Sequence, residues 1–415
     1  MSDFQTDVRV AMAQMREAFP ETPLQRSSFL SDRYGAEIWL KREDLTEVRS
    51  YKLRGAFAFF TRALAEGRAT RFACASAGNH AQGFAWCCAR MGVTGTIFMP
   101  STTPGQKVEK TKAFGGDAVD IQLVGDFFDD CLGAAKAFVA ETGACFVPPF
   151  DAPETILGQA TVTAEILDQL GHAPDMLVMP VGGGGLSAGA RKYLQAVGAP
   201  TELLLVEPGT APSLAKALEH GAPFRLPKIS NFVDGAAVAE IGSHPFAALK
   251  GMRRADVFAV PEDRLCGTLV ELLNSEGIVL EPAGALAIDV LQDIEPERLA
   301  GKTVVCAASG GNFDFERLPE VKERALRYRG LKKYYVIRLP QRPGALKDFL
   351  LMLGPKDDIF RFEYLKKSAR NFGSVLIGID TDKAENFERL VTQMDAYGIG
   401  WRDITDSADL VDLIV

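Results

Sequence analysis

The sequence MLVMPVGGGGLSAGARKYLQAV at residues 176–197 places an apolar run, four consecutive glycines and a longer mixed segment in direct succession. A short apolar run bounded by glycine is typical of a buried strand, and the segment after the glycines is typical of a helix. Consecutive glycines permit positive φ angles and let backbone N–H groups converge without interference from Cβ atoms. The stretch therefore predicts a strand, a concave loop suited to a phosphate, and a helix.

The glycine run does not fit two other phosphate-binding patterns. It lacks the Gly-Lys-Ser/Thr ending of a P-loop, and it lacks the G-x-G-x-x-G spacing of a dinucleotide fingerprint. The alternative interpretation is a flexible turn without a ligand.

The same alternation of short apolar runs and longer amphipathic runs extends outward from this stretch. It predicts a layered α/β fold with a largely parallel sheet. The expected strands are residues 38–40, 72–75, 96–99, 176–179, 203–206 and 303–307. The expected helices are residues 105–114, 126–141, 156–170 and 262–275.

The pattern changes after about Arg329, which predicts two domains, residues 1–329 and 330–415. The charged segment 322–330 is the candidate linker between them. In the second domain we expect a β-α-β-β-α-β order, which is typical of a ferredoxin-like α+β fold. Its expected elements are strand 332–339, a helix from near 344, strands 359–365 and 374–379, and helix 384–396.

Composition excludes several classes of protein. A chain of 415 residues exceeds what one hydrophobic core usually organises. The net charge of −8 without a long Lys/Arg run argues against nucleic-acid binding. The N-terminus does not resemble a signal peptide, and no 18-residue apolar run occurs, so we expect a cytoplasmic protein without a membrane partner.

Cysteine and histidine usage argues against disulfide bonds and against a metal site. Seven scattered cysteines without C-x-x-C pairs predict reduced, mostly buried thiols, and four histidines without an H-E-x-x-H pattern predict no metal site.

Three further motifs follow expected strands. S-Y-K-L-R-G-A at 50–56 opens a helix and carries Lys52, whose amine can form a Schiff base when burial or nearby positive charge, such as that of Arg54, lowers its pKa. S-A-G-N-H at 76–80 starts a helix whose N–H groups suit a substrate carboxylate. Ser309, in A-S-G-G-N, places a hydroxyl at the end of an apolar strand. The alternatives are a surface lysine, an N-cap serine with a glycine turn, and an unremarkable serine.

In this order, S-Y-K-L-R-G-A, S-A-G-N-H-A-Q-G, G-G-G-G-L and S-G-G-N resemble the fold type II pyridoxal-phosphate enzymes, which have a tryptophan synthase β-like catalytic domain of two subdomains with parallel sheets. The resemblance spans about residues 5–325. K-R-E-D-L at 41–45, P-G-Q-K at 104–107 and E-P-A-G-A at 281–285 resemble the serine/threonine dehydratase branch. Tyr51 departs from the phenylalanine that is commoner before the lysine.

The resemblance implies pyridoxal 5′-phosphate as the cofactor and roles for the residues of these motifs. Lys52 would hold the cofactor and act as the catalytic base. Asn79 would contact the ring hydroxyl, and Ser309 would face the pyridine nitrogen. The residues implied to bind the phosphate are Gly182, Gly183, Gly184, Gly185 and Leu186. The residues implied to bind the substrate are Ser76, Ala77, Gly78, Asn79 and His80.

In the C-terminal part, L-P-Q-R-P-G-A-L at 339–346 and F-E-Y-L-K-K at 362–367 resemble the ACT-like regulatory domain of biosynthetic threonine dehydratases. The implied reaction converts L-threonine to 2-oxobutanoate and ammonia, the first step of isoleucine biosynthesis, with L-serine as a second candidate substrate. Isoleucine and valine are the implied effectors, and a homo-oligomer, a dimer or a tetramer, is the implied assembly. A structural or dimerising module is the alternative for this domain.

Two rival functions share parts of this pattern. A catabolic serine/threonine dehydratase or a serine racemase would share all four motifs, but the C-terminal domain argues against both. An amino-acid sensor without turnover would be expected to have lost the lysine or the glycine run, and this chain has both.

Overall fold

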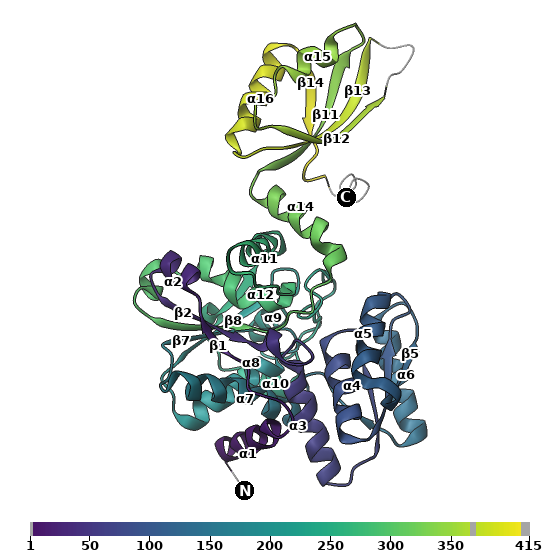
Figure 1. The fold of residues 1–415 in the computed structure, drawn as a ribbon, viewed down its shortest axis with the longest axis vertical. Coiled ribbons are helices and arrows are strands. Elements are labelled where there is room, and N and C mark those ends of the chain that lie inside the picture. Colours follow the sequence, from purple (N-terminus) through teal and green to yellow (C-terminus); the bar gives the residue numbers. More distant parts are fainter. Residues whose placement is uncertain (1–2, 366–370, 408–415) are drawn as a thin grey trace. The chain divides into compact units, whose positions relative to one another are not determined.

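The computed structural model describes residues 3–365 and 371–407. The chain divides into two compact units, Met1–Phe313 and Asp314–Val415, here called the N-terminal and C-terminal units. Figure 1 shows the helices and strands of both units.

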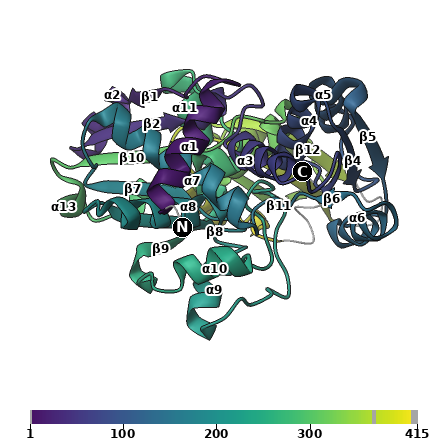
Figure 2. The ribbon, with the colours of Figure 1, turned by 90° about the horizontal axis from the view of Figure 1, so that it is seen from below.

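Among the described residues, the N-terminal unit contains a six-stranded sheet in the order β1-β2-β10-β7-β8-β9. Only β1 pairs antiparallel with its neighbour, so the largely parallel sheet expected from the sequence is confirmed. Figure 2 shows β2, β10 and β7 side by side. The strands are β1 (Leu24–Arg26), β2 (Glu37–Arg42), β7 (Met176–Pro180), β8 (Glu202–Pro208), β9 (Val257–Val260) and β10 (Thr303–Ala308).

The second sheet of this unit is parallel throughout, in the order β5-β4-β3-β6. Its strands are β3 (Arg71–Ala75), β4 (Thr94–Met99), β5 (Val119–Leu123) and β6 (Cys145–Phe146). In Figure 1, α4, α5 and α6 lie around this sheet. The two sheets correspond to the two expected subdomains.

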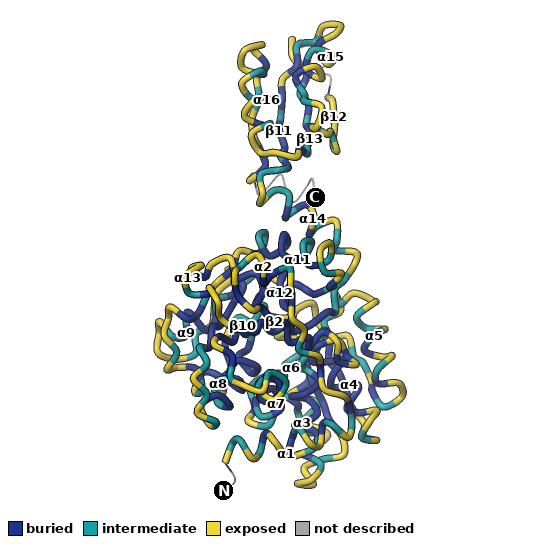
Figure 3. The backbone as a smooth tube through the Cα atoms, turned by 60° about the vertical axis from the view of Figure 1, so that its left-hand side comes forward, coloured by how far each residue is buried: buried dark blue, intermediate teal, exposed yellow. Residues whose placement is uncertain are grey.

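Helices that begin just after the strands position the sites described below. The longer helices of the N-terminal unit are α1 (Phe4–Arg16), α3 (Lys52–Ala65), α4 (Asn79–Met91), α5 (Gly105–Gly115), α6 (Phe128–Thr142), α7 (Pro153–Leu170), α8 (Gly185–Val197) and α11 (Glu262–Glu276). The shorter ones are α2 (Ser28–Tyr34), α9 (Ser213–His220), α10 (Ser243–Leu249), α12 (Pro282–Asp289) and α13 (Pro296–Leu299). Figure 3 shows that buried residues concentrate in the strands and on the inner faces of these helices. Among the described helices, none combines the length and the apolar character that crossing a membrane requires.

In the C-terminal unit, β11 (Lys332–Pro340), α15 (Ala345–Leu350), β12 (Asp358–Leu365), β13 (Phe372–Asp380), α16 (Glu385–Ala396) and β14 (Gly400–Asp403) follow in that order. The strands form an antiparallel sheet in the order β12-β13-β11-β14. Alternate residues of β11 and β13, such as Ile337 and Ile377, pack against Phe387 and Leu390 of α16. The expected β-α-β-β-α-β fold is therefore confirmed.

The segment expected to be a linker, residues 322–330, instead lies largely within helix α14 (Leu318–Tyr328). Val321 and Ala325 of this helix are buried, and so is one of its charged residues, Glu323. Glu323 accepts a hydrogen bond from the Tyr334 hydroxyl at 2.8 Å and pairs with Lys332 at 2.7 Å. These contacts make α14 part of the C-terminal unit, so that unit begins at Asp314 rather than at residue 330.

All seven cysteines are free, and all but the partly buried Cys145 are buried, as expected.

Candidate cofactor and active site

One cavity of the N-terminal unit brings all four sequence motifs together. It lies where β7 and β10 end, because Gly182 comes two residues after β7 and Ser309 comes directly after β10. Lys52 and Asn79, the first residues of α3 and α4, reach the same cavity. Its lining residues are Tyr51, Lys52, Asn79, Pro180, Gly182, Gly235, Ala236, Glu281, Ala283 and Ser309.

Lys52 presents a poorly solvated amine to this cavity. Its Nζ donates a hydrogen bond to the Pro149 carbonyl at 3.1 Å and lies 5.3 Å from the ring centre of Tyr51 and 5.9 Å from that of Phe150. Desolvation lowers the pKa of Lys52 to about 8, although the negative charge of Glu281 opposes this shift. A lysine with a pKa near neutrality has an appreciable neutral fraction and can act as a nucleophile.

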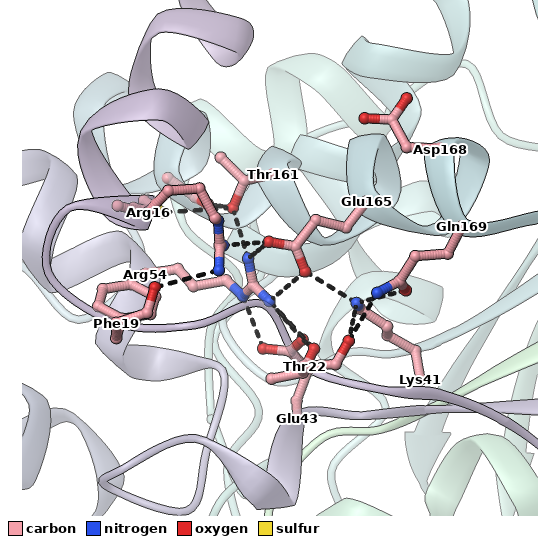
Figure 4. Close-up of polar contacts among 12 residues, drawn as sticks. Arg16, Phe19, Thr22, Lys41, Glu43, Arg54, Thr161, Glu165, Asp168 and Gln169 are labelled. Carbon is pink, nitrogen blue, oxygen red and sulfur yellow. Dashed lines mark hydrogen bonds and ion pairs between the residues drawn. The ribbon is translucent and has the colours of Figure 1, made fainter.

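The expectation that Arg54 helps to lower this pKa is wrong. The Arg54 guanidinium is fully buried and is committed to two carboxylates, with Nε 2.7 Å from Glu43 and Nη2 2.7 Å from Glu165. Lys41 also pairs with Glu165, at 2.8 Å. Figure 4 shows these ion pairs, which join Arg54 of α3 to Glu43 just after β2 and to Glu165 of α7, and join Glu165 to Lys41 of β2. The carboxylates neutralise the guanidinium, so the lowered pKa of Lys52 comes from desolvation.

The segment 76–80 joins β3 to α4. The Ser76 N–H donates to the Phe98 carbonyl at 3.1 Å, and the Gly78 N–H donates to the Ser76 hydroxyl oxygen at 3.2 Å. The N–H groups of Ala77, Asn79 and His80 donate to no acceptor within the described chain. Three backbone donors at a helix start are therefore available for an anion.

The His80 side chain is already hydrogen-bonded within the protein. Its Nε2 lies 2.9 Å from the Val147 carbonyl. Burial, with a smaller effect of the Lys52 charge, lowers the pKa of His80 to about 3. The imidazole is therefore neutral at physiological pH, and Nε2 carries the proton that it donates to Val147.

The glycine run forms the turn between β7 and α8. Gly184 has φ +88°, and Gly185 begins α8. In the described part of the chain, the N–H groups of residues 182–186 donate to no protein acceptor. Leu186 packs into the hydrophobic core. The free N–H groups of this turn and helix start form the concave donor set that an anion requires.

The glycines are also needed for close packing. A Cβ on Gly182 would lie 2.9 Å from the Cα of Ala236, and a Cβ on Gly183 would lie 2.2 Å from the ring of Phe150. Of the four glycines, Gly184 alone has a positive φ.

Ser309 is buried at the end of β10. Its Oγ donates to the Ala283 carbonyl at 3.2 Å, and its own carbonyl accepts from the Tyr51 N–H at 3.1 Å. The second contact ties the strand end to the residue that precedes Lys52. The site thus offers a neutral hydroxyl to a ligand in the cavity.

Glu281 lines the cavity, but the sequence assigned no role to it. It was visible only as the first residue of the E-P-A-G-A motif. Its Oε1 accepts a hydrogen bond from Asn79 Nδ2 at 2.6 Å. Burial and the nearby charge of Asp234 raise the pKa of Glu281 to about 7. The sequence did not predict this contact, because Glu281 lies 202 residues from Asn79 and no charge pattern links the two residues.

The donor set fits pyridoxal phosphate. The cavity combines an amine, a neutral hydroxyl and an amide with the free N–H groups of the glycine turn, which matches an aldehyde, a pyridine ring with its hydroxyl, and a phosphate. Over the described residues, no group of His, Cys, Asp and Glu side chains could hold a metal ion. The fold and the site together define a fold type II pyridoxal-phosphate-dependent enzyme.

Comparisons with known proteins agree with this class. Residues 15–310 match the family described as pyridoxal-phosphate dependent enzyme, and residues 323–414 match the family described as the C-terminal regulatory domain of threonine dehydratase. The L-threonine dehydratase biosynthetic IlvA of Halalkalibacterium halodurans is 42% identical over 410 residues, which are 99% of this chain and 98% of that protein.

The protein of the same name from Bacillus subtilis is 42% identical over 402 residues, covering 97% and 95% of the two chains. The structure of the processed form of threonine deaminase isoform 2 from Solanum lycopersicum has a TM-score of 0.73 and 34% identity, covering 78% of this chain and 87% of that chain. The chain belongs to the pyridoxal-phosphate-dependent enzyme family, within the group of biosynthetic threonine dehydratases.

Proposed function

We propose that this chain is a threonine ammonia-lyase that converts L-threonine to 2-oxobutanoate and ammonia, the first step of isoleucine biosynthesis. The observation that carries the proposal is the desolvated amine of Lys52, placed in one cavity with Asn79, Gly182 and Ser309. Full-length relatives named as biosynthetic threonine dehydratases support the choice of substrate. L-Serine, which has the same β-hydroxyl group, is the second candidate substrate.

In this proposal, the Lys52 amine would bind the cofactor at its aldehyde carbon. The same amine would later remove the Cα proton of the substrate. Both tasks need a neutral amine, and desolvation supplies one near physiological pH. When bound, pyridoxal phosphate supplies an electron sink for the charge left on Cα.

Other groups in and beside the cavity would hold and orient the cofactor. The N–H groups of residues 182–186 would bind its phosphate, and Asn79 would donate to its ring hydroxyl oxygen. Ser309 faces the pyridine nitrogen. A neutral hydroxyl stabilises a protonated ring nitrogen less than a carboxylate would, so loss of the β-hydroxyl is favoured over transamination.

The substrate carboxylate binds at the start of α4. Of the five residues expected there, Ala77, Asn79 and His80 have backbone N–H groups free to donate, whereas Ser76 and Gly78 already donate within the chain. Binding there fixes the Cα–H bond relative to Lys52. Such positioning lowers a reaction barrier by up to several kcal/mol.

The C-terminal unit is the proposed receptor for isoleucine as an inhibitor, with valine opposing it. The match to the C-terminal regulatory domain of threonine dehydratase supports this role. We further propose a cytoplasmic homo-oligomer, a dimer or a tetramer, that binds neither nucleic acid nor membrane.

Formation of 2-oxo acid from a panel of β-hydroxy amino acids tests the function. We expect turnover of L-threonine, weaker turnover of L-serine, and a yellow protein whose colour borohydride bleaches. A racemase would instead release D-amino acid without net ammonia, and a sensor would show neither product. Either of these results would overturn the proposed reaction.

A further inference from the structure

The side-chain amide of Asn79 is held on both sides. Its Nδ2 donates to Glu281 Oε1 at 2.6 Å, and its Oδ1 accepts from Asn312 Nδ2 at 2.7 Å. An asparagine amide could be turned by 180° and still fit the same space, so its partners decide which end faces the cavity.

The hydrogen-bond partners of Asn312 determine the orientation of the Asn79 amide. Asn312 Oδ1 accepts a hydrogen bond from the Lys110 ammonium, which can only donate. Asn312 Nδ2 donates to the Val48 carbonyl at 2.9 Å, which can only accept. Two one-directional partners therefore set the orientation of Asn312. Its NH₂ group must face Asn79, and the Asn79 oxygen must face Asn312.

Gly310 leaves room for the hydrogen bond between Asn79 and Glu281. A Cβ on Gly310 would lie 2.2 Å from Glu281 Oε1 and 3.4 Å from Asn79 Nδ2. A Cβ on Gly235 would lie 3.5 Å and 3.9 Å from the same two atoms, which is ordinary van der Waals contact, so Gly235 is not needed for this hydrogen bond. Any other residue at 310 would push the Glu281 carboxyl group away from Asn79.

We propose that Lys110, Asn312 and Glu281 are positioning residues that fix the NH₂ group of Asn79 toward the cavity. Glu281 takes one N–H of that group, and the other remains for an acceptor on the ligand. The site therefore selects a cofactor whose ring oxygen is unprotonated. This inference rests on the proposed function only in taking pyridoxal phosphate as the ligand.

Asn312→Asp tests the direction of this chain of hydrogen bonds. The introduced carboxylate can still accept from Lys110, but it cannot donate to Asn79. The Asn79 amide must then turn, and its oxygen faces Glu281 and the cavity. We expect the dissociation constant for pyridoxal phosphate to rise about tenfold, in line with loss of one hydrogen bond to a charged group. The visible absorption band of the bound cofactor should weaken relative to its near-ultraviolet band.

Asn274→Asp is the matched control, because Asn274 is exposed on α11 and the substitution adds the same charge. We expect its cofactor affinity and spectrum to equal those of the wild type. Circular dichroism of each variant checks that the fold is kept.

Lys110→Glu changes the same hydrogen-bond network at Lys110 instead of at Asn312. It tests whether the network orients Asn79 if Asn312→Asp does not fold. A carboxylate at this position repels the Asn312 oxygen and favours a turn of the Asn312 amide, which the Val48 carbonyl alone then opposes. The NH₂ group of Asn312 is therefore held less firmly toward Asn79. The affinity and the spectrum should change as in Asn312→Asp.

Folded Asn312→Asp and Lys110→Glu variants with wild-type affinity and wild-type spectra would overturn this inference alone. A wild-type chain that binds no pyridoxal phosphate would overturn both the inference and the proposed function. A wild-type chain that binds the cofactor and does not act on threonine would overturn only the function.

Discussion

Burial shifts the ionisation of three side chains around the cavity in ways that suit different tasks. Desolvation lowers the pKa of Lys52 to about 8 and that of His80 to about 3, and it raises the pKa of Glu281 to about 7. The imidazole is therefore neutral and structural near neutral pH. The amine and the carboxyl group each titrate within about one pH unit of neutrality.

Glu281→Gln should change how the stability of the cofactor-free chain depends on pH. The carboxyl pKa rises from 4.5 to about 7 on folding, so the folded chain retains a proton that the unfolded chain loses. Wild-type stability should therefore fall relative to that of Glu281→Gln as pH rises from about 4.5 to 7. The difference should reach at most about 3 kcal/mol. Urea unfolding at pH 4.5 and pH 8 measures it, and a difference independent of pH would contradict the assignment.

Gly184→Ala should weaken cofactor binding more than it weakens the fold. The φ of +88° strains any residue with a Cβ, and relief of that strain would move the N–H groups of the phosphate site. We expect at least about tenfold weaker binding of pyridoxal phosphate, because hydrogen bonds to a charged group are lost.

Gly35→Ala is the control for Gly184→Ala. Gly35 has φ +61° at the end of α2, with open space around it, so its replacement carries the backbone cost without a phosphate nearby. Equal cofactor affinity in the two variants would argue against a phosphate site at residues 182–186.

The sequence predicted four of the ten residues that line the cavity and missed those that act through tertiary contacts, such as Glu281. Lys52, Asn79, Gly182 and Ser309 follow strands of a parallel fold, so their motifs alone were enough to bring them together. The interpretation of Arg54 failed because its partners are Glu43, in the turn after β2, and Glu165 of α7, which lies 111 residues away in the sequence.

At the scale of elements, a buried ion network ties α3 to the six-stranded sheet and to α7. Arg54 lies two residues after Lys52, and its bonds to Glu43 and Glu165 hold the start of α3 beside the cavity (Figure 4). Among the described residues, Arg54 is the cation that pairs with the buried Glu43.

Arg54→Leu should destabilise the protein strongly, because it leaves the Glu43 carboxylate buried without a cation. Loss of one partner of a buried ion pair typically costs about 3 to 5 kcal/mol. Arg62→Leu is the control on the same helix, since Arg62 pairs with Glu66 at the surface and should cost at most about 1 kcal/mol. Urea unfolding compares the two variants. Similar losses would show that the buried network contributes little.

Elements with clear periodicity were predicted well, and short or charged ones were not. Helix 105–114 and strand 332–339 agree with the structure to within one residue at each end. The strands β1, β5, β6 and β9 were missed, since they span only two to five residues and are partly exposed. Residues 322–330, which lie largely within α14, were interpreted as a linker because they are rich in charge. The structure shows that Val321 and Ala325 of this helix are buried.

At the scale of the whole molecule, the C-terminal unit should couple isoleucine binding to activity. Isoleucine must bind one conformational state more tightly than another. A difference of about 1 to 3 kcal/mol would change apparent activity by about 5- to 150-fold. Threonine should then weaken isoleucine binding by the factor by which isoleucine weakens threonine binding. Calorimetric titration of the full chain with isoleucine, with and without threonine, measures this reciprocity.

The control for isoleucine regulation is a chain that ends at Phe313, so that α14 is removed together with the sheet to which it belongs. We expect its activity to be indifferent to isoleucine. Hyperbolic kinetics of the full chain that isoleucine does not alter would make the C-terminal unit a structural or dimerising module.

The central claim is that Lys52 carries the chemistry of threonine elimination. The most direct test is the steady-state rate of 2-oxobutanoate formation from L-threonine by the wild type and by Lys52→Ala, each saturated with pyridoxal phosphate. Lys136→Ala, at an exposed position on α6, is the control and should retain full activity. Since general base catalysis alone contributes about 10²- to 10⁴-fold, we predict a rate loss of at least that size in Lys52→Ala with the fold unchanged. A correctly folded Lys52→Ala variant with near-normal turnover would contradict the account.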